Sequence, residues 1–437
     1  MKLYNFLTKK IDNFNLKKGD KIGIYVCGPT VYSHIHVGNA RPTIFFDALV
    51  RYLRYKQIDV LYVSNITDID DKIIKKAISE NTTEREIAHR YSAEYLHNLN
   101  GLNCLFPDII PYATKYIDHI IEFIQSLISK NLAYAKNGNV YFRVNSISTY
   151  GAISNQNTEQ LEVGARIALN PDKENPLDFL LWKNTDEGIK FKSPFGLGRP
   201  GWHTECAVMN KELFEDTIFI HGGGADLKFP HHENERAQFL GETNLEIAKY
   251  FMHVGRVNAG NQKMSKSIGN VVNVNEIIEK GQTNGFRMLI LSHNFESPIS
   301  FTKELLEENQ TLFDKTMRKL RILTFNHKKA GYKFNEINEE VLVNFEKCME
   351  DGFLTPLALS DLLQVVKKLN ISETSDLSAE LIASVYKVFE ILGFSVKIPE
   401  FSLDDFQLFE SWCQARLDKD FKKADELRCI LTEKELI

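Results

Sequence analysis

The stretch KIGIYVCGPTVY, residues 21–32, decides the fold of the first part of the chain. It opens with an alternating run rich in β-branched and aromatic side chains and stops at Gly28-Pro29, the pattern of a strand that ends in a tight turn. Residues 41–57 (RPTIFFDALVRYLRYKQ) follow with helical spacing, and residues 60–67 (VLYVSNIT) again have strand composition. A strand, a helix and a strand within about 45 residues predict a right-handed parallel crossover.

Further strands of the same sheet are predicted at residues 216–227 (DTIFIHGGGADL) and 287–293 (RMLILSH). Residues 115–200 hold a helix and then polar, irregular sequence, which indicates an insertion. After about residue 305 apolar residues recur at helical spacing, for example from Leu381 to a stop at Gly393. We therefore expect an α/β fold, a doubly wound parallel-sheet (Rossmann-like) domain interrupted once and followed by an all-α helical bundle.

Bulk composition is that of a globular protein. The chain has 437 residues, 43% hydrophobic and 25% charged, so two or three domains are expected. No apolar run reaches the roughly 20 residues that span a bilayer, and the N-terminus lacks a secretory pattern, so a cytoplasmic location without membrane contact is expected. The net charge of −5 gives no general attraction to nucleic acid. Six scattered cysteines without a CxxC pair argue against a disulfide framework.

Two stretches have the composition of phosphate-binding segments. HVGNAR, residues 36–41, lies between the first strand and the helix expected from Pro42. Gly38 lets the backbone approach a ligand, and a helix N-terminus offers free N–H groups to a phosphate. KMSKS, residues 263–267, places two lysines on a loop that can cover phosphates. An ordinary βα loop and a solvated basic loop are the alternatives.

A third stretch, FPHHENERAQF at residues 229–239, has the composition of a helix that starts near its proline. On such a helix His231 and Glu235 are one turn apart and can supply two metal ligands. Solvated helix surface is the alternative reading of this pair.

Together, HVGN and KMSKS resemble the two signatures of class I aminoacyl-tRNA synthetases, with Asn39 in place of the last histidine of the HIGH consensus. Five segments narrow the resemblance to the cysteinyl-tRNA synthetase family: YVCGPTVY, NITDIDDKI, RPGWHTEC, HGGGADLKFPHHENE and KMSKSIGN. They span roughly residues 20–270. The tail matches more weakly through ARLDKDFKKADELRCIL, MEDGFLTPLAL (349–359) departs from the family's MDDDFNTPEAL, and relatives usually continue beyond the point where this chain ends.

The resemblance implies one Zn²⁺ per chain, held by Cys27, Cys206, His231 and Glu235. Two thiolates, an imidazole and a carboxylate suit this borderline-soft ion. Zinc would distinguish cysteine from serine by binding the substrate sulfur, so rejection of serine is expected at activation. The other four cysteines are expected to be small, buried apolar side chains.

Further roles are implied by the same resemblance. His36, Asn39, Lys263 and Lys266 are the expected catalytic residues. ATP, with Mg²⁺, is expected to contact His36, Gly38, Asn39, Gly222, Gly223, Gly224, Asp226 and Lys266. Thr67, Trp202 and His203 are expected to contact the amino acid. The alternative for Trp202 is core packing, and for His203 it is a position behind the residues that contact the substrate. The alternative for the aspartates after Thr67 is helix capping, and for the glycines it is a permissive turn.

The implied activity is that of a cysteine–tRNA ligase, a monomer that binds ATP, L-cysteine and tRNA(Cys). The expected domains are residues 1–114 and 201–260 (catalytic), 115–200 (insertion), 261–305 (KMSKS loop and stem contact) and 306–437 (anticodon binding). Phe409, Trp412 and Arg416 are candidate RNA contacts by residue type. A tRNA-independent ligase that joins cysteine to an amine, and a non-catalytic zinc protein that binds RNA, are the rival interpretations.

Overall fold

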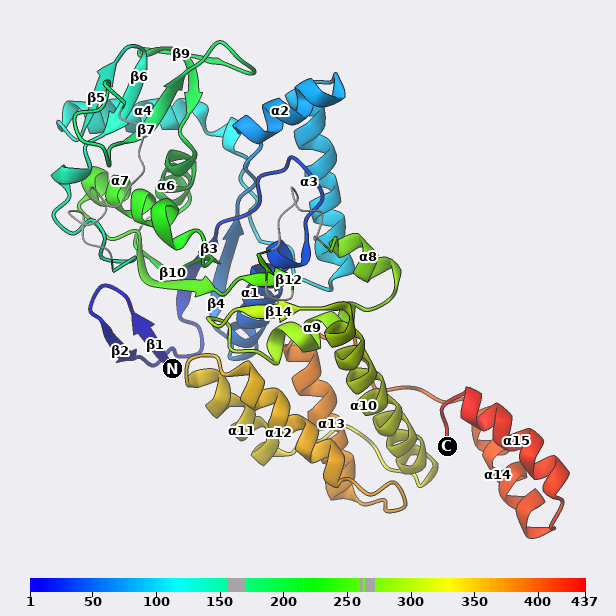
Figure 1. Cartoon of the computed structure of the whole chain (residues 1–437). Coiled ribbons are helices and arrows are strands. Elements are labelled where there is room, and N and C mark those ends of the chain that lie inside the picture. The colour runs from blue at the N-terminus through cyan, green and yellow to red at the C-terminus, as the bar shows by residue number, and fades with distance from the viewer. Residues whose placement is uncertain (156–169, 215, 260–261, 264–271) are drawn as a thin grey trace. The chain divides into compact units, whose positions relative to one another are not determined.

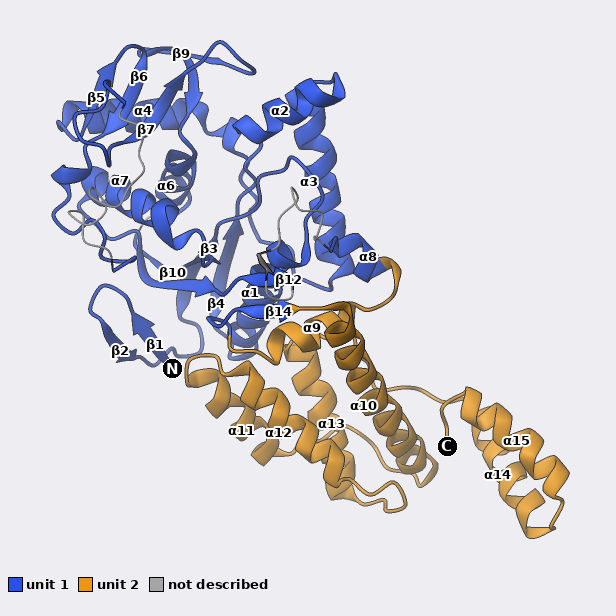
Figure 2. Ribbon diagram, in the orientation of Figure 1, with its two compact units in different colours: residues 1–278, 295–300 blue, residues 279–294, 301–437 orange. Residues whose placement is uncertain are grey.

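The computed structural model describes residues 1–155, 170–214, 216–259, 262–263 and 272–437 (Figure 1). The chain forms two compact units (Figure 2). Unit 1 consists of residues 1–278 and 295–300, and unit 2 of residues 279–294 and 301–437. Within the described ranges, every helix is too short or too polar to cross a membrane.

A four-stranded parallel sheet lies at the centre of unit 1. Its strands, in the order β11-β10-β3-β4, are β11 (Ala248–Val254), β10 (Ile218–Gly224), β3 (Lys21–Val26) and β4 (Asp59–Ser64). Helix α1 (Val37–Tyr55) joins β3 to β4, and helix α7 (Glu233–Thr243) lies between β10 and β11 in the chain. The predicted doubly wound sheet is confirmed.

The central strand β3 explains why the sheet forms where it does. Ile24, Tyr25 and Val26 are buried, and β3 pairs with neighbours on both sides, as in Ile24↔Tyr62 and Ile24↔Ile220. The chain leaves β3 toward β4 on one side and returns later on the other side through β10. In open α/β sheets a ligand crevice forms where the strand order reverses in this way, at the carboxyl ends of the strands.

Helix α1 begins earlier than predicted, at Val37 instead of near Pro42. His36 is the N-cap: its ring accepts a hydrogen bond from the Gly38 N–H, and the Asn39 side chain accepts one from the His36 N–H. Because this capping box satisfies the helix end, Pro42 lies inside the helix. HVGN is thus the cap and first turn of the helix and not a loop before it.

The insertion contains far more regular structure than the predicted single helix. After helix α4 (Ile117–Ser129) come five antiparallel strands in the order β5-β6-β7-β9-β8. They are β5 (Ala133–Lys136), β6 (Asn139–Phe142), β7 (Phe179–Asn184), β8 (Phe191–Ser193) and β9 (Gly196–Pro200). Val140, Phe142, Leu181 and Trp182 form one core with Phe123 of α4. The strands are short and flanked by polar residues, which hides the alternation that identifies longer strands.

Unit 2 is helical apart from the end of strand β14 (Ile299–Phe301) within the described residues. Its helices are α9 (Thr283–Leu291), α10 (Lys303–Lys329), α11 (Glu339–Glu350), α12 (Thr355–Lys368), α13 (Asp376–Ile391), α14 (Leu403–Leu417) and α15 (Phe421–Glu433). Gly393 has a left-handed φ of 76° just beyond α13, which confirms the predicted stop there.

The prediction of a strand at residues 287–293 is wrong, because these residues belong mainly to α9. A short, continuous apolar run fits a buried strand and a buried helix equally well. Here every residue from Gly285 to Leu291 is buried, and α9 packs against α10, where the Gly285 N–H donates to Gln310 Oε1.

The remaining described elements are small or peripheral. They are β1 (Lys2–Asn5), β2 (Lys10–Asn13), α2 (Asp71–Glu80), α3 (Glu84–Gly101), α6 (Trp202–Leu213), η3 (Lys228–His232), β12 (Val257–Ala259), β13 (Gln262–Lys263), α8 (Val274–Glu279) and two short 3-10 turns, η1 (Ala113–Lys115) and η2 (Val144–Ser146). The finer predicted domain boundaries, at residues 115, 201, 261 and 306, remain predictions.

Candidate metal and substrate site

Cys27 is held at the carboxyl edge of the sheet by the backbone around it. Its N–H donates to the Gly222 carbonyl of β10 at 2.9 Å, and the next N–H, of Gly28, donates to Asn65 Oδ1 at 2.9 Å. A Cβ at position 28 would lie 1.7 Å from the Asn65 carbonyl oxygen, so only glycine fits there. The turn that ends β3 therefore fixes the thiol beside the crevice.

The four predicted metal ligands come together, from three separate segments of unit 1. Their ligand atoms all lie within 4.8 Å of one another. Cys27 Sγ is 3.9 Å from Cys206 Sγ of α6 and 3.5 Å from Glu235 Oε1 of α7, while His231 Nε2 of η3 is 2.5 Å from Glu235 Oε1. Cys206, His231 and Glu235 are at most 2% exposed. We call these four residues the metal cluster.

A second set of possible ligands shares Cys27 and Glu235 and adds two histidines that the sequence did not suggest. His221 lies on β10, with Nε2 2.5 Å from Glu235 Oε2, and His232 Nδ1 is 2.9 Å from His253 Nε2 of β11. All three imidazoles are buried. The sequence offers one sign of these buried histidines. His221 lies within the apolar run of residues 216–227, so its side chain is expected to be buried.

The charges of Glu235 and His231 stabilise each other. Burial alone would raise the pKa of Glu235, but the charges and hydrogen bonds of His231 and His221 outweigh it and hold the pKa well below its usual range. Burial likewise opposes protonation of His231, and the Glu235 charge with the hydrogen bond to Cys206 outweighs it and raises the pKa to about 10. An ionised carboxylate is thus present in a fully buried position.

The two thiols differ in acidity. A hydrogen bond from Cys27 lowers the pKa of Cys206 to about 6, whereas burial and the interactions with Cys206 and Glu235 raise the pKa of Cys27 well above its usual value. Burial also lowers the pKa values of His203 and His253 to about 3, so both rings are neutral at pH 7. Cys206 is therefore the more acidic thiol of the pair, and the hydrogen bond and positive charge of His231 also favour its thiolate.

Trp202 and His203 flank the cluster. The Trp202 ring stacks on His231 with centroids 4.1 Å apart, and His203 Nδ1 is 2.9 Å from His231 Nδ1. Gly201, the residue before α6, passes so close to β7 that a Cβ there would lie 2.0 Å from the Leu180 carbonyl oxygen, so only glycine fits at this position. The aromatic wall expected at Trp202 is thus 39% exposed and directly beside the cluster.

The predicted Thr67 lies in the same crevice and is 2% exposed. Its N–H donates to the Pro29 carbonyl at 3.1 Å, and its hydroxyl accepts from Asn65 Nδ2 at 3.3 Å. Of the aspartates that follow, Asp70 is the N-cap of α2, while Asp68 accepts two hydrogen bonds from Thr114. Thr67 therefore ties the β3 turn to the end of β4.

Packing explains two of the three glycines at the end of β10. A Cβ at Gly222 would lie 2.2 Å from the Phe46 ring of α1, and one at Gly223 would lie 2.8 Å from Leu227. At Gly224 the nearest atom would be Oδ1 of Asp226, at 2.6 Å, at the end of a side chain. Gly224 and Asp226 are the part of this turn where close approach to a ligand is compatible with the packing.

At the first turn of α1, the N–H groups expected to be free are all bonded. The Val37 N–H donates to the Val272 carbonyl, the Gly38 N–H to the His36 ring, and those of Asn39 and Ala40 to the His36 carbonyl. A phosphate that binds here must replace some of these bonds.

The chain that follows the second signature motif contacts this turn. Lys266 lies outside the described residues, and of Lys263 only the backbone in β13 is described. The chain resumes at Val272 and Asn273, where His36 forms an isolated antiparallel bridge with Asn273. Val272 and Asn273, which follow KMSKS in the chain, therefore lie beside the start of HVGN.

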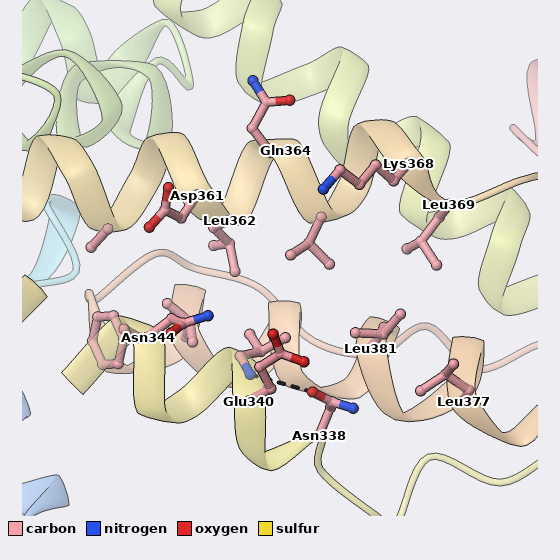
Figure 3. A pocket seen from close by; sticks show the side chains of 15 residues that line it. Asn338, Glu340, Asn344, Asp361, Leu362, Gln364, Lys368, Leu369, Leu377 and Leu381 are labelled. Carbon is pink, nitrogen blue, oxygen red and sulfur yellow. Dashed lines mark hydrogen bonds between the residues drawn. The ribbon is translucent and has the colours of Figure 1, made fainter. Parts of the chain in front are cut away.

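A hollow of about 500 Å³ in unit 2 lies between α11, α12 and α13 (Figure 3). Leu362, Leu369 and Leu381 line it, and Glu340, Asp361 and Lys368 are the charged residues among its described lining. That lining holds neither histidine nor cysteine. The groove thus lacks the chemistry of the metal cluster.

The three predicted RNA contacts lie at one aromatic cluster of unit 2. Phe409 and Trp412 are partly buried against a core that contains Phe325 of α10, and the Arg416 guanidinium lies 4.9 Å from the Trp412 ring centroid. Of the four other cysteines, Cys104 and Cys348 are buried as expected, whereas Cys413 is half-buried and Cys429 is exposed.

The sequence of this chain is similar to those of known proteins. A family described as "tRNA synthetases class I (C) catalytic domain" matches residues 13–311. The cysteine–tRNA ligase of Acholeplasma laidlawii is 43% identical over 100% of both chains. That of Lachnoclostridium phytofermentans is also 43% identical, over 100% of this chain and 97% of its own.

Solved structures are similar in fold at low sequence identity. Methionyl-tRNA synthetase of Mycobacterium tuberculosis, in complex with methionyl-adenylate, superimposes with a TM-score of 0.60 at 14% identity, covering 85% of this chain and 89% of its own. A putative arginyl-tRNA synthetase of Campylobacter jejuni gives 0.59 at 14% identity, covering 88% and 95%.

Proposed function

The chain belongs to the cysteine–tRNA ligase family of class I aminoacyl-tRNA synthetases, and we propose that it activates L-cysteine with ATP and transfers it to the 3′ end of tRNA(Cys). The observation that carries the proposal is the metal cluster, four potential ligand side chains gathered within 4.8 Å at the carboxyl edge of the parallel sheet. That edge is where ligands bind in folds of this kind. The expected cytoplasmic location and monomeric state are part of the same proposal.

The donor chemistry of the cluster fits zinc. In tetrahedral coordination, two sulfur ligands each about 2.3 Å from the ion are about 3.8 Å apart; Cys27 Sγ and Cys206 Sγ are 3.9 Å apart. The 2.5 Å contact of His231 Nε2 with Glu235 Oε1 is a hydrogen bond that coordination would replace. A bound zinc ion would favour a thiolate over a hydroxyl as its further ligand, which would select cysteine over serine.

The geometry around the two candidate sets favours Cys206 and His231 over His221 and His232 as the partners of Cys27 and Glu235. The set that contains Cys206 and His231 offers two sulfur ligands. It also leaves other side chains in contact with its imidazole and carboxylate ligands. His203 contacts the far nitrogen of His231, and His221 contacts the second oxygen of Glu235. Ligands of structural and catalytic metals are usually held by such outer partners.

The remaining steps rest on the chain's own residues. His36 and Asn39, at the first turn of α1, would hold phosphate oxygens of ATP, which Mg²⁺ accompanies. Lys266, with Lys263, would offset negative charge as pyrophosphate leaves. The turn at Gly224 and Asp226 would receive the adenosine, and Thr67, Trp202 and His203 would line the amino-acid site. Attack by the substrate carboxylate on the α-phosphate then needs positioning and charge neutralisation more than a protein nucleophile.

Cysteine-dependent pyrophosphate exchange tests the activation step. We expect exchange with L-cysteine, far slower exchange with serine, and loss of exchange after chelation that zinc restores. Comparable exchange with both amino acids would contradict the proposed selectivity. Charging of tRNA(Cys) separates this activity from that of a ligase that joins cysteine to an amine, and absence of exchange would favour the non-catalytic RNA-binding alternative.

Metal content per chain tests the choice of ligands. Cys206→Ser should purify with little zinc, whereas His232→Gln should retain about one ion per chain. Folding of both variants is checked by thermal unfolding in parallel. Zinc loss in His232→Gln with retention in Cys206→Ser would favour the second set of ligands.

A further inference from the structure

A separate hollow in unit 1 adjoins Trp202 and His203. Its volume is about 340 Å³, and α2, the insertion strands and the start of α6 contribute its walls. Three carboxylates line it, those of Asp70, Asp71 and Glu205. The question is which of them is available to a ligand.

Two of the three carboxylates are already engaged. Asp70 accepts the hydrogen bond from the Lys72 N–H that caps α2. Asp71 binds Lys183 at 2.8 Å and also pairs with Arg199. Lys183 and Arg199, the two cations that the insertion strands contribute to this hollow, therefore both pair with Asp71.

Glu205 is the carboxylate that remains. It is 1% exposed, and among the described residues its Oε2 atom has no hydrogen-bond partner. A buried carboxylate without a donor is costly, so such a group is expected to meet a donor in the functional state. Burial, together with negative charge from Cys206, Asp68 and Asp70, raises the pKa of Glu205 well above its usual value against the opposing effect of His231, so the charged carboxylate is favoured only beside a cation.

The position of Glu205 relates it to the metal cluster. It precedes Cys206 in the chain, and it lies one turn after Trp202 on α6, so the two side chains share a helix face. Trp202 stacks on His231 at 4.1 Å. From these contacts, and on the premise that the site activates cysteine, we propose that Glu205 binds the α-ammonium group of the amino-acid substrate.

The chemistry of the substrate matches this arrangement. In cysteine two carbons separate the sulfur from the amino nitrogen, so a sulfur at the cluster brings the ammonium group to its immediate surroundings. An ammonium group supplies three hydrogen-bond donors and a positive charge. Among the described residues, no such donor reaches the Glu205 Oε2 atom. Glu205 is then a specificity residue for α-amino acids, whereas the metal cluster is specific for the thiol.

Binding of cysteine analogues tests the assignment. In the wild type, 3-mercaptopropionate, which lacks the amino group, should bind about 10- to 100-fold more weakly than L-cysteine, the range for one charge-assisted hydrogen bond. Cysteamine, which keeps the amino group and lacks the carboxylate, should lose less affinity relative to L-cysteine than 3-mercaptopropionate does. Glu205→Gln should weaken L-cysteine binding by a similar factor and leave 3-mercaptopropionate unchanged.

Glu212→Gln is the matched control, because Glu212 lies on the same helix and is half-exposed. It should leave all three affinities unchanged, and Glu205→Asp should retain part of the preference for the amino group. The proposal is overturned if wild type binds 3-mercaptopropionate as tightly as cysteine, a test that needs no variant, or if Glu205→Gln binds both as wild type does. A wild type without cysteine-dependent exchange would instead overturn the proposed function.

Discussion

The metal cluster and the first turn of α1 lie at the same edge of one sheet, yet they are assembled in opposite ways. The cluster gathers Cys27 and Cys206, 179 residues apart, with His231 and Glu235 from a third segment. The first turn of α1 takes its polar groups from the contiguous residues His36 to Asn39. The cluster depends on the tertiary fold, whereas the turn depends on local capping.

This difference implies a division of labour. Buried, charged side chains in the cluster suit recognition of a small substrate, because interactions in a low-dielectric environment are strong and specific. N–H groups at a helix end suit a phosphate, and in this structure they are occupied by local bonds that a ligand can exchange. Variants at the two places should therefore fail in different kinetic parameters.

The largest expected effect separates the two places directly. Lys266→Ala should slow cysteine activation by about 100- to 1000-fold, the range for loss of one group that stabilises transition-state charge. Its affinity for cysteine should stay within twofold of wild type, because the thiol contacts are intact. Pyrophosphate exchange and cysteine titration measure the two quantities. Unchanged activation would remove the role assigned to Lys266.

A smaller effect is expected from an outer partner of the cluster. His221→Gln removes the ring that contacts Glu235 Oε2 at 2.5 Å, and loss of such a partner typically weakens metal binding by about 10- to 100-fold. Competition with a fluorescent chelator measures the affinity. His119→Gln is the control, since that side chain is 48% exposed. Complete loss of zinc from His221→Gln would indicate that His221 is itself a ligand.

Packing supplies the third prediction. Gly222→Ala places a Cβ 2.2 Å from the Phe46 ring and should destabilise unit 1 by about 1–3 kcal/mol, the usual cost of overpacking a core. Gly224→Ala meets only the end of the Asp226 side chain and should cost less stability while raising the KM for ATP. Urea unfolding and exchange kinetics distinguish the two. Equal stability of both variants would contradict packing as the reason for Gly222.

Sequence reasoning succeeded for the strongest local signals and missed a weaker one, and it failed where the outcome depended on tertiary context. The strand at residues 21–32 and the helix stop at Gly393 followed from periodicity and turn residues. The insertion hairpin had a signal that went unread: Asn137-Gly138, with both φ values positive, joins β5 to β6. The helix α9 could not be predicted from its short apolar run.

The predictions for the candidate site show the same difference between local signals and tertiary context. Family resemblance supplied the four members of the metal cluster, which no spacing rule would have joined across 179 residues. His221 on β10 and His253 on β11 were not predicted, because a single buried histidine on a strand has no local pattern. Their proximity results from the register of β10 and β11, where His253 pairs with Gly223, and that register is a property of the fold.

The smallest expected effect tests whether Asn39 acts only as a cap. Asn39→Ala removes the side chain that accepts from the His36 N–H at 3.2 Å, and it should cost about 0.5–1 kcal/mol of stability. Glu86→Ala is the matched control, because Glu86 completes the same kind of capping box on α3. If Asn39 also holds a phosphate oxygen, its variant alone should raise the KM for ATP, by about 3- to 10-fold for one hydrogen bond. Matching changes in the two variants, with unaltered KM, would restrict Asn39 to the cap and leave His36 as the polar side chain that contacts ATP in this turn.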